Sequence, residues 1–338
     1  MYPALLWEKL PDNRVRCGTC QWFCRINEGQ TGVCRMYRND AGALFNLNYA
    51  KISSLAVDPI EKKPLYHFHP GSKVFSLGSW GCNFHCRGCQ NWEIACPEDE
   101  NGLRYSREIL PERAVEMACQ SGSAGIAWTY NEPSVWLEYT LETARLAKAQ
   151  GLYTVYVTNG YASEAQLDAI GPFLDAWRVD VKGFNNQSYR KIGRVQNYEG
   201  ILRVTERASH KWGMHVEVVT NIMPCINDDD NQLRGIAEWI AGSLSPLTPW
   251  HITRFHPRRQ MQDYPVTPLE TMERALALGV AAGLEFVYLG NVGGNDSGDT
   301  VCYNCGQKAV KRSGYSARIM GLVGTHCRFC GTELNFRV

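Results

Sequence analysis

The stretch VFSLG (residues 74–78), followed after three residues by CNFHCRGC (residues 82–89), decides how the chain is interpreted. The first segment is a continuous apolar run of strand length, and the second is a loop with three cysteines in the spacing C-x3-C-x2-C. In parallel α/β barrels, the loops after the carboxyl ends of the strands converge on one mouth. A cysteine loop in this position is therefore expected at a functional site.

Strand-like and helix-like segments continue to alternate through the middle of the chain, which is typical of parallel strands joined by helical crossovers. Apolar runs without polar alternation indicate strands that are covered on both faces. The predicted strands are Val74–Gly78, Gly125–Thr129, Tyr153–Thr158, Trp177–Val181, His215–Thr220, His251–Phe255 and Glu285–Leu289. Six or seven such units approach a barrel, complete or partial. The sequence TPLE (residues 267–270) predicts a helix start capped by Thr267.

The composition indicates an ordinary enzyme-sized protein: 338 residues, a net charge of +1, 44% hydrophobic and 20% charged residues. The chain has no apolar run of the roughly eighteen residues that a membrane helix needs, and it does not begin with the pattern of a signal peptide. We therefore expect a cytoplasmic protein. Its balanced charge gives no electrostatic reason to expect a nucleic-acid or membrane partner.

Cysteine is unusually frequent, with 14 residues, and most of them fall into three groups. Close C-x2-C pairs in a large chain without a secretion signal favour metal binding over disulfides. The groups suggest a Cys-rich metal-binding segment at residues 1–50, an α/β barrel at 51–297 and a second metal-binding segment at 298–338. Cys119 lies in an apolar helical pattern and is expected in the core. The groups are Cys17, Cys20, Cys24 and Cys34; Cys82, Cys86 and Cys89; and Cys302, Cys305, Cys327 and Cys330.

The three-cysteine group has a specific chemical meaning. Three thiolates that hold a four-iron cluster leave one iron without a protein ligand. This open iron can bind the amino and carboxylate groups of S-adenosylmethionine (SAM) and pass an electron into its sulfonium, which releases methionine and a 5′-deoxyadenosyl radical. The alternatives are a three-cysteine zinc site completed by His85 or another residue, and a loop without metal.

Several motifs around this loop resemble the AmmeMemoRadiSam-system branch of the radical SAM superfamily, which is similar to the pyruvate formate-lyase activating enzymes. They are DPIEKKPLYHFHPGSK (residues 58–73), GCNFHC (81–86), QNWEI (90–94) and TYNEP (129–133). The similarity extends from about Cys17 to the last cysteine pair. It implies a partial (β/α)6 TIM-like barrel with a [4Fe-4S] cluster at Cys82, Cys86 and Cys89, and SAM as the second cofactor.

The resemblance also implies which residues bind SAM. The expected contacts are Asn131 and Glu132 for the amino group, Thr158 and Asn159 in a turn beside the cofactor, Asp180 and Lys182 for the ribose and carboxylate, and His256. Gly88 stands where relatives usually have an aromatic residue, so only its backbone can contact adenine, and Trp92 is a candidate for the lost stacking. Simpler interpretations are a helix-start acid for Glu132, an ion pair for Asp180 and Lys182, and a structural role for His256.

The two flanking groups differ in regularity. CYNCG (residues 302–306) and CRFCG (327–331) are paired knuckles that predict a closed tetrahedral site. Zinc is the expected ion, with redox iron or an additional iron–sulfur cluster as alternatives. The N-terminal C-x2-C-x3-C-x9-C group predicts zinc or a second four-iron cluster. Because nothing in its spacing demands redox chemistry, a structural metal is favoured there.

These observations predict an oxygen-sensitive radical SAM enzyme that abstracts a hydrogen atom from its substrate. By analogy with the activating enzymes, the substrate is expected to be a glycyl-radical protein, and a small-molecule radical reaction is the alternative. A hypothesis of another class is a non-catalytic metal-binding adaptor. Low-potential electrons are expected from a flavodoxin or ferredoxin. The sequence assigns no role to Cys225.

Overall fold

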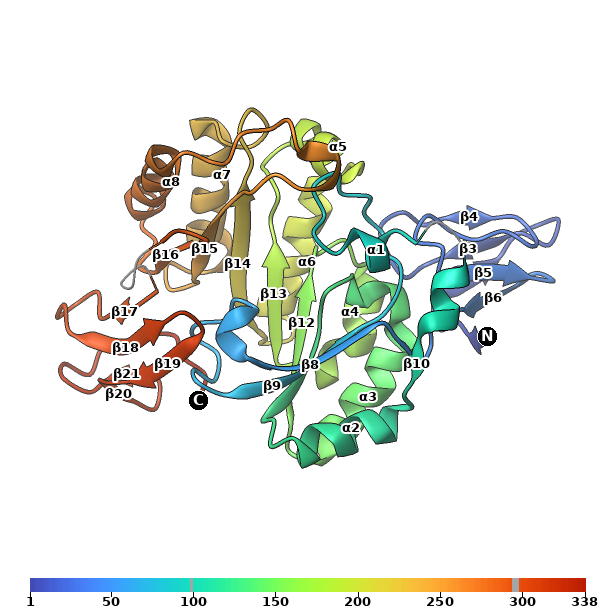
Figure 1. Cartoon of the computed structure of the whole chain (residues 1–338), viewed down its shortest axis with the longest axis horizontal. Helices are drawn as coiled ribbons and strands as arrows, with labels where there is room; N and C mark the ends of the chain where they lie inside the picture. Colours follow the sequence, from blue (N-terminus) through green and yellow to red (C-terminus); the bar gives the residue numbers. More distant parts are fainter. Residues whose placement is uncertain (98–99, 294–297) are drawn as a thin grey trace. The chain divides into compact units, whose positions relative to one another are not determined.

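The computed structural model describes residues 1–97, 100–293 and 298–338 (Figure 1). Its main sheet has eight strands in the order β16-β15-β14-β13-β12-β11-β9-β8. The order begins at β16 and ends at β8, so the sheet is open, as in a partial barrel. The predicted α/β fold is confirmed. The predicted division at residues 50 and 297 stays a prediction, and residue 297 lies outside the described residues.

All seven predicted strands are present, and their ends differ from the predicted ones by at most two residues. Most of their residues are buried, and in β11 every residue is buried. This burial explains why the runs lack polar alternation. The strands are Lys73–Gly78 (β9), Gly125–Trp128 (β11), Tyr153–Thr158 (β12), Ala176–Asp180 (β13), His215–Ile222 (β14), Trp250–Arg254 (β15) and Val287–Gly290 (β16), and β8 is Ser54–Pro59.

The chain forms two compact units. Unit 1 comprises Met1–Val57, Val74–Trp177 and Glu199–Met214, and unit 2 comprises Asp58–Lys73, Arg178–Tyr198 and His215–Val338. In unit 1, β11 pairs in parallel with both β9 and β12, with Gly125 opposite Val74 and Tyr153. The loops that follow these three strands therefore leave the sheet at the same edge.

Four longer helices belong mainly to unit 1, and two of them, α2 and α3, pack against each other (Figure 1). In α2 the buried face consists of small apolar residues, including Ala114, Val115 and Ala118. Cys119 lies on the exposed face, so its predicted place in the core is wrong. The helices are Pro111–Gln120 (α2), Leu137–Ala149 (α3), Glu164–Ile170 (α4) and Tyr198–His210 (α6), and the short α1 is Trp92–Ala95.

The Cys-rich N-terminal segment is built from two small antiparallel sheets, β1-β6-β5 and β2-β3-β4. It has a small core of its own, which includes Val15, Ile26 and Leu44. Glu138 of α3 anchors this segment, because its carboxylate accepts hydrogen bonds from the Leu5 amide and the Tyr37 hydroxyl, both at 2.8 Å. The strands are Tyr2–Pro3 (β1), Trp7–Lys9 (β2), Val15–Cys17 (β3), Arg25–Ile26 (β4), Tyr37–Asp40 (β5) and Ala43–Asn46 (β6); Lys51–Ile52 (β7) pairs with Arg107–Glu108 (β10).

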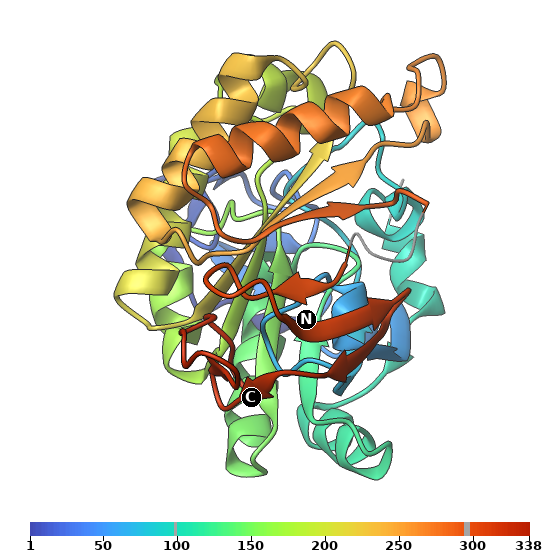
Figure 2. The same ribbon diagram turned by 90° about the vertical axis from the view of Figure 1, so that its left-hand side faces the viewer.

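In unit 2, β15 pairs in parallel with β14 and β16, and α7 and α8 lie side by side (Figure 2). The C-terminal strands form a three-stranded sheet, β17-β18-β19, and a hairpin, β20-β21. The remaining bounds are Asn186–Gly193 (α5), Asp230–Trp239 (α7), Leu269–Ala281 (α8), Thr300–Val301 (β17), Lys308–Ser313 (β18), Ser316–Ile319 (β19), Leu322–Val323 (β20) and His326–Cys327 (β21).

The predicted cap of α8 is wrong. The helix begins at Leu269 with Pro268 at the N-cap position and no side-chain cap. The Thr267 hydroxyl instead accepts a hydrogen bond from the Phe255 amide at 3.0 Å and donates one to the Ile222 carbonyl at 2.6 Å. Its hydrogen bonds therefore join the ends of β14 and β15, because these strand ends offer buried backbone groups that need partners.

Part of the motif at residues 58–73 has a structural explanation in unit 2. The buried carboxylate of Glu217 accepts hydrogen bonds from the amides of Tyr66 and His67, at 3.0 and 2.8 Å. Two histidine rings, those of His215 and His251, contact the same carboxylate. The motif thus supplies donors to a buried acid that would otherwise be costly to hold. In the part of the chain that is described, no helix combines the length and apolar character needed to cross a membrane.

Candidate active site and metal centres

The predicted cluster loop follows β9 and is tightly packed in unit 1. Gly81, directly before Cys82, has a φ of +80°, and a Cβ there would lie 2.7 Å from the Cys34 carbonyl oxygen. Only glycine fits this turn without displacing the N-terminal segment. Asn131, after β11, holds the same turn: it donates to the Gly81 carbonyl at 2.9 Å and accepts from the Ser79 amide at 3.0 Å.

Asn159, after β12, reaches the cluster loop from the next strand. Its side-chain nitrogen Nδ2 lies 2.7 Å from Asn83 Oδ1 and 3.8 Å from Cys82 Sγ. The Phe84 amide also points at Cys82 Sγ, at 3.4 Å. Such N–H groups stabilise a thiolate and tune the reduction potential of a cluster bound to it. Residues that follow three neighbouring strands thus meet at the segment from Ser79 to Asn83.

Asn83 was not singled out from the sequence, and its environment bears on the cofactor. Its side chain is buried, and Nδ2 has no hydrogen-bond partner among the described residues. A buried amide donor beside Cys82 is costly unless a ligand accepts from it. This donor therefore fits a site that holds a sulfur- or oxygen-rich group.

Glu132 lies at the centre of the loops that follow β11 and β12. Its carboxylate accepts four hydrogen bonds: three on Oε1, from the Ser134 amide and the hydroxyls of Ser134 and Thr158, and one on Oε2, from the Asn159 amide. Burial raises its pKa. The residue therefore braces both loops, and Oε2 retains more acceptor capacity than Oε1.

The three cysteines of the loop are partly exposed. Burial, followed by the charges of Glu132, Cys86 and Cys89, raises the pKa of the Cys82 thiol, so a thiolate there needs the positive charge of a metal. Among the described residues, the three sulfurs are not one of the groups whose donor atoms all lie within 4.8 Å. A cluster does not require such a close group, because each thiolate binds its own iron. His85, the proposed fourth zinc ligand, has Nδ1 3.6 Å from Cys96 Sγ.

The other predicted SAM contacts are in unit 2. Asp180 pairs with Lys182 at 2.9 Å and also with Arg178, and all three side chains are at least partly buried. Burial acts to raise the pKa of Asp180, but the charges of Arg178 and Lys182 outweigh it and hold this pKa at about 2. The ion pair expected as the simpler interpretation is thus present. His256 follows β15 and is exposed.

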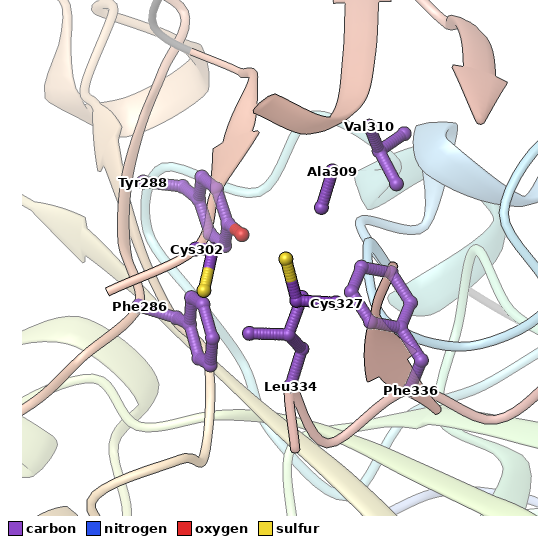
Figure 3. Packing of buried hydrophobic residues seen from close by; sticks show 8 residues of the cluster. All are labelled: Phe286, Tyr288, Cys302, Ala309, Val310, Cys327, Leu334 and Phe336. Carbon is purple, nitrogen blue, oxygen red and sulfur yellow. The ribbon is translucent and has the colours of Figure 1, made fainter. Parts of the chain in front are cut away.

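The C-terminal cysteines form a compact site in unit 2. The Sγ atoms of Cys302 and Cys330 are 3.6 Å apart, as are those of Cys305 and Cys327, and all four sulfurs lie within 4.8 Å of one another. Metal–sulfur bonds of about 2.3 Å in a tetrahedron place sulfurs about 3.8 Å apart, so one ion fits here. Cys302 and Cys327 belong to a buried cluster that includes Phe286 (Figure 3).

Each C-terminal knuckle is closed by a glycine with positive φ, +70° at Gly306 and +75° at Gly331. Hydrogen bonds from Thr332 lower the pKa of the Cys330 thiol to about 6. The Cys330 thiol donates to the Thr332 hydroxyl at 3.2 Å, and this hydroxyl also accepts from Asn304 Nδ2 at 3.0 Å. Once Cys330 is a thiolate, the hydroxyl proton can turn to the sulfur. Such supporting contacts orient metal ligands.

The four N-terminal cysteines line one hollow in unit 1, together with residues that include Trp22, Val33 and Val135. Cys17 and Cys20 are buried. Burial raises the pKa of Cys17 to about 11 and that of Cys34 to about 12. Buried thiols in an apolar hollow keep their protons unless a cation replaces them, and metal binding by this group stays a prediction.

Comparisons with known proteins give the family. A sequence profile of the radical SAM superfamily matches residues 79–240. The chain is 41% identical over 338 residues to uncharacterized protein MJ0808 of Methanocaldococcus jannaschii, covering 99% of both chains. It is 22% identical over 282 residues to uncharacterized protein MJ0674 of the same organism, covering 80% of this chain and 76% of that one. It is 23% identical over 205 residues to the pyruvate formate-lyase-activating enzyme of Clostridium pasteurianum, covering 57% of this chain and 82% of that enzyme.

The matched region begins at Ser79, one residue after β9, and includes the cysteine loop and the residues after β11 and β12 that hold it. A radical SAM domain implies a [4Fe-4S] cluster and SAM, and members of this superfamily are enzymes. The resemblance inferred from the motifs is confirmed. The chain belongs to the radical SAM superfamily and is similar to its activating enzymes.

Proposed function

We propose that this protein reductively cleaves SAM at a cluster held by Cys82, Cys86 and Cys89, and that it abstracts a hydrogen atom from a substrate. The observation that supports this most directly is the Cys82 environment, where N–H groups of Phe84 and Asn159 approach the sulfur. When bound, a cluster with three thiolate ligands supplies an open iron for SAM and the electron that splits its sulfonium.

The chain's own residues bind and orient the cofactor in this proposal. We assign Oε2 of Glu132 to the SAM amino group, since this oxygen accepts one described hydrogen bond. Asn131, Thr158 and Asn159 position the surrounding loops, and the unpartnered Asn83 amide donates to the cluster or to SAM. The proposed contacts also include the Gly88 backbone, the Asp180–Lys182 pair and His256. Trp92, at the start of α1 and 38% exposed, is assigned to adenine stacking.

For the substrate, we infer a glycyl-radical protein that loses a hydrogen atom from a glycine Cα. Support comes from the similarity to the pyruvate formate-lyase-activating enzyme and from a 26% identity over 175 residues to the isethionate sulfite-lyase activating enzyme of Nitratidesulfovibrio vulgaris. A small-molecule substrate is the second candidate. Electrons come from a flavodoxin or ferredoxin, and the C-terminal site holds zinc. A reducing cytoplasm suits the many thiols.

The cleavage step is tested by anaerobic reconstitution and an assay for 5′-deoxyadenosine under strong reductant. Cys86→Ala is expected to abolish the product. Cys119→Ala, which changes an exposed cysteine on α2, is the matched control and is expected to retain it. The proposal would be contradicted if the wild-type protein formed no 5′-deoxyadenosine, or if zinc were bound at Cys82, Cys86 and Cys89. Either result would favour a non-catalytic metal-binding adaptor.

The substrate is tested separately. A glycyl-radical substrate predicts a persistent protein radical on a partner after turnover, detectable by electron paramagnetic resonance. Formation of 5′-deoxyadenosine together with a modified metabolite, and no partner radical, would favour the small-molecule reaction.

A further inference from the structure

The two four-cysteine groups differ in how far apart their sulfurs lie. In the C-terminal group, the sulfurs of two cysteine pairs are 3.6 Å apart, and all four lie within 4.8 Å. The N-terminal four are not such a group, although all of them are among the described residues. Instead they line a shared hollow.

This difference has a direct chemical meaning. Four thiolates around one ion must approach one another closely, because each binds the same atom. Four thiolates around a four-iron cluster each bind a different iron, so their sulfurs stand apart at separate corners. Four cysteines that line one hollow but do not form such a close group therefore match a cluster better than a single ion.

We propose that Cys17, Cys20, Cys24 and Cys34 hold a second four-iron cluster, and that electrons reach the Cys82 loop through it. With a cysteine on every iron, this cluster has no open corner and serves electron transfer rather than SAM binding. The electron path rests on the proposed function, since it requires a cluster at Cys82. The binding of iron at the N-terminal site does not.

The surroundings of the hollow suit a buried cluster. Trp22, Ile26, Val33 and Val135 contribute apolar side chains to its lining. Such a lining limits the access of water and oxidants to iron and sulfide. Val135 follows Ser134, whose amide and hydroxyl both bind Glu132. One wall of the hollow is therefore the segment that braces the proposed SAM site.

Two contacts join the N-terminal cysteines to the cluster loop within unit 1. Trp22, two residues after Cys20, donates from Nε1 to the Asn83 carbonyl at 2.8 Å, and Asn83 directly follows Cys82. On the other side of the loop, a Cβ at Gly81 would lie 2.7 Å from the Cys34 carbonyl oxygen. Residues next to both cysteine groups are thus in direct contact.

Aromatic rings add a second connection. The rings of Trp22 and Tyr161 have centroids 6.1 Å apart, and those of Tyr161 and Phe84 are 5.4 Å apart. Phe84 lies between Cys82 and Cys86 in the sequence. The Gln21 amide also donates to the Tyr161 carbonyl at 3.1 Å, which fixes Tyr161 against the N-terminal segment. Packed groups and short hydrogen bonds therefore connect the two sites continuously.

The electron balance is simple. One electron leaves a reduced flavodoxin or ferredoxin, enters the N-terminal cluster and then passes to the Cys82 cluster. Its transfer into the sulfonium breaks the S–C5′ bond of SAM and yields methionine and the 5′-deoxyadenosyl radical. The donor is oxidised by one electron for each SAM cleaved.

The first test uses the wild-type protein and needs no variant. After anaerobic reconstitution, metal analysis and Mössbauer spectroscopy are expected to give about eight irons per chain in four-iron clusters, and about one zinc ion. A count of about four irons with about two zinc ions would overturn the proposal.

The second test locates the extra iron. Cys20→Ser combined with Cys24→Ser is expected to lower the count to about four irons. The remaining paramagnetic resonance signal is expected to change when SAM is added, because only the open cluster binds it. Cys119→Ser combined with Cys225→Ser, at two exposed cysteines outside the three groups, is the matched control and is expected to leave the iron unchanged. If the variant with Cys20→Ser and Cys24→Ser kept the iron content of the wild type, the N-terminal cysteines would not hold the second cluster.

The electron path is tested with two reductants. With reduced flavodoxin as donor, the Cys20/Cys24 variant is expected to form no 5′-deoxyadenosine, whereas dithionite, a small ion, restores the product. Trp22→Phe keeps an aromatic ring but loses the hydrogen bond to the Asn83 carbonyl. We therefore expect 5′-deoxyadenosine formation to fall several-fold with flavodoxin as donor and to stay unchanged with dithionite. Trp212→Phe, which likewise loses an indole hydrogen bond, to Asp168 at 3.0 Å, is the matched control and is expected to keep its activity with both reductants.

The outcomes separate the two proposals. Equal losses with both reductants in the Cys20/Cys24 variant would refute the electron path. If the proposed SAM cleavage itself is wrong, the wild type forms no 5′-deoxyadenosine with dithionite and shows no SAM-dependent signal. If only the second cluster is wrong, the wild type still forms 5′-deoxyadenosine with dithionite and still shows the SAM-dependent signal, but its iron count is about four.

Discussion

The two four-cysteine groups of this protein contain the same ligands in different arrangements. In the C-terminal group, local turns bring two knuckles together until their sulfurs are 3.6 Å apart. In the N-terminal group, the cysteines are distributed over β3, the β3–β4 connection and the segment before β5. They line a hollow to which the turn Pro133–Trp136, directly before α3, also contributes. The number of thiolates is equal, so the space between them decides what binds.

The largest expected effect concerns the stability that the C-terminal metal provides. Cys302→Ser with Cys305→Ser, or removal of the ion by a chelator, should lower the free energy of unfolding of unit 2 by several kcal/mol, because metal binding is coupled to folding. The buried cluster around Cys302 and Cys327 would lose its centre. Denaturant unfolding followed with zinc analysis measures this. An unchanged unfolding midpoint after zinc loss would show that the knuckles fold without metal.

Gly81→Ala tests whether the N-terminal site depends on contact with the cluster loop. The new Cβ meets Met36 Cγ at 2.4 Å and the Cys34 carbonyl at 2.7 Å, in addition to the cost of a positive φ. We expect a loss of more than about 2 kcal/mol and a lower iron content. Unfolding curves and iron analysis measure these effects.

Gly122→Ala is the matched control, since Gly122 also has a positive φ, +66°, but its added Cβ would have no heavy atom within 4 Å. This variant should lose only about 1–2 kcal/mol in the free energy of unfolding, the cost of a positive φ for alanine, and its iron content should be that of the wild type. Equal behaviour of the two variants would mean that the N-terminal segment does not press on the cluster loop.

Tyr37→Phe tests how the N-terminal segment is anchored. Tyr37 and Glu138 are both buried, and the substitution removes the donor to Glu138 Oε2. We expect a loss of about 1–3 kcal/mol in the free energy of unfolding, since a buried acceptor loses its partner. Tyr105→Phe, at a residue that is 84% exposed, is the control. Equal unfolding midpoints for the two variants would argue against this anchor.

The smallest expected effect concerns metal retention at the C-terminal site. Thr332→Val removes the hydroxyl beside Cys330 Sγ and should weaken zinc binding about tenfold, the lower range for the loss of a supporting contact. Iron at the N-terminal site should not change. Competition with a zinc chelator measures the affinity. Thr325→Val, outside the knuckles, is the control, and an equal affinity in both variants would contradict the prediction.

Much of the fold was predictable because buried parallel strands carry a strong local signal. Runs such as Tyr153–Thr158 consist of β-branched and aromatic residues without a charge, and each became a strand with nearly the predicted ends. The cap of α8 was not predictable, since Thr267 has hydrogen-bond partners at the ends of two strands that are distant in sequence. A local pattern cannot show that a tertiary partner competes for the same hydroxyl.

The candidate site was predictable in its residues but not in their contacts. The motifs identified Asn131, Glu132 and Asn159, yet only the structure shows that Asn131 holds the Gly81 turn and that Asn159 reaches Cys82 Sγ. Asn83 carries no motif of its own, and its buried amide became notable only once its surroundings were known. Single-sequence patterns identify residue types, whereas donors and acceptors are matched in three dimensions.

By itself, the sequence determined the parallel α/β class, the three thiolates of the cluster loop and the paired knuckles, because these depend on short-range spacing and on continuous apolar runs. Tertiary structure alone decided that the N-terminal cysteines surround a hollow and that Trp22 contacts the Asn83 carbonyl. The physical reason is that a metal centre is selected by the distances between its ligands, and those distances are set by the packing of segments far apart in the chain.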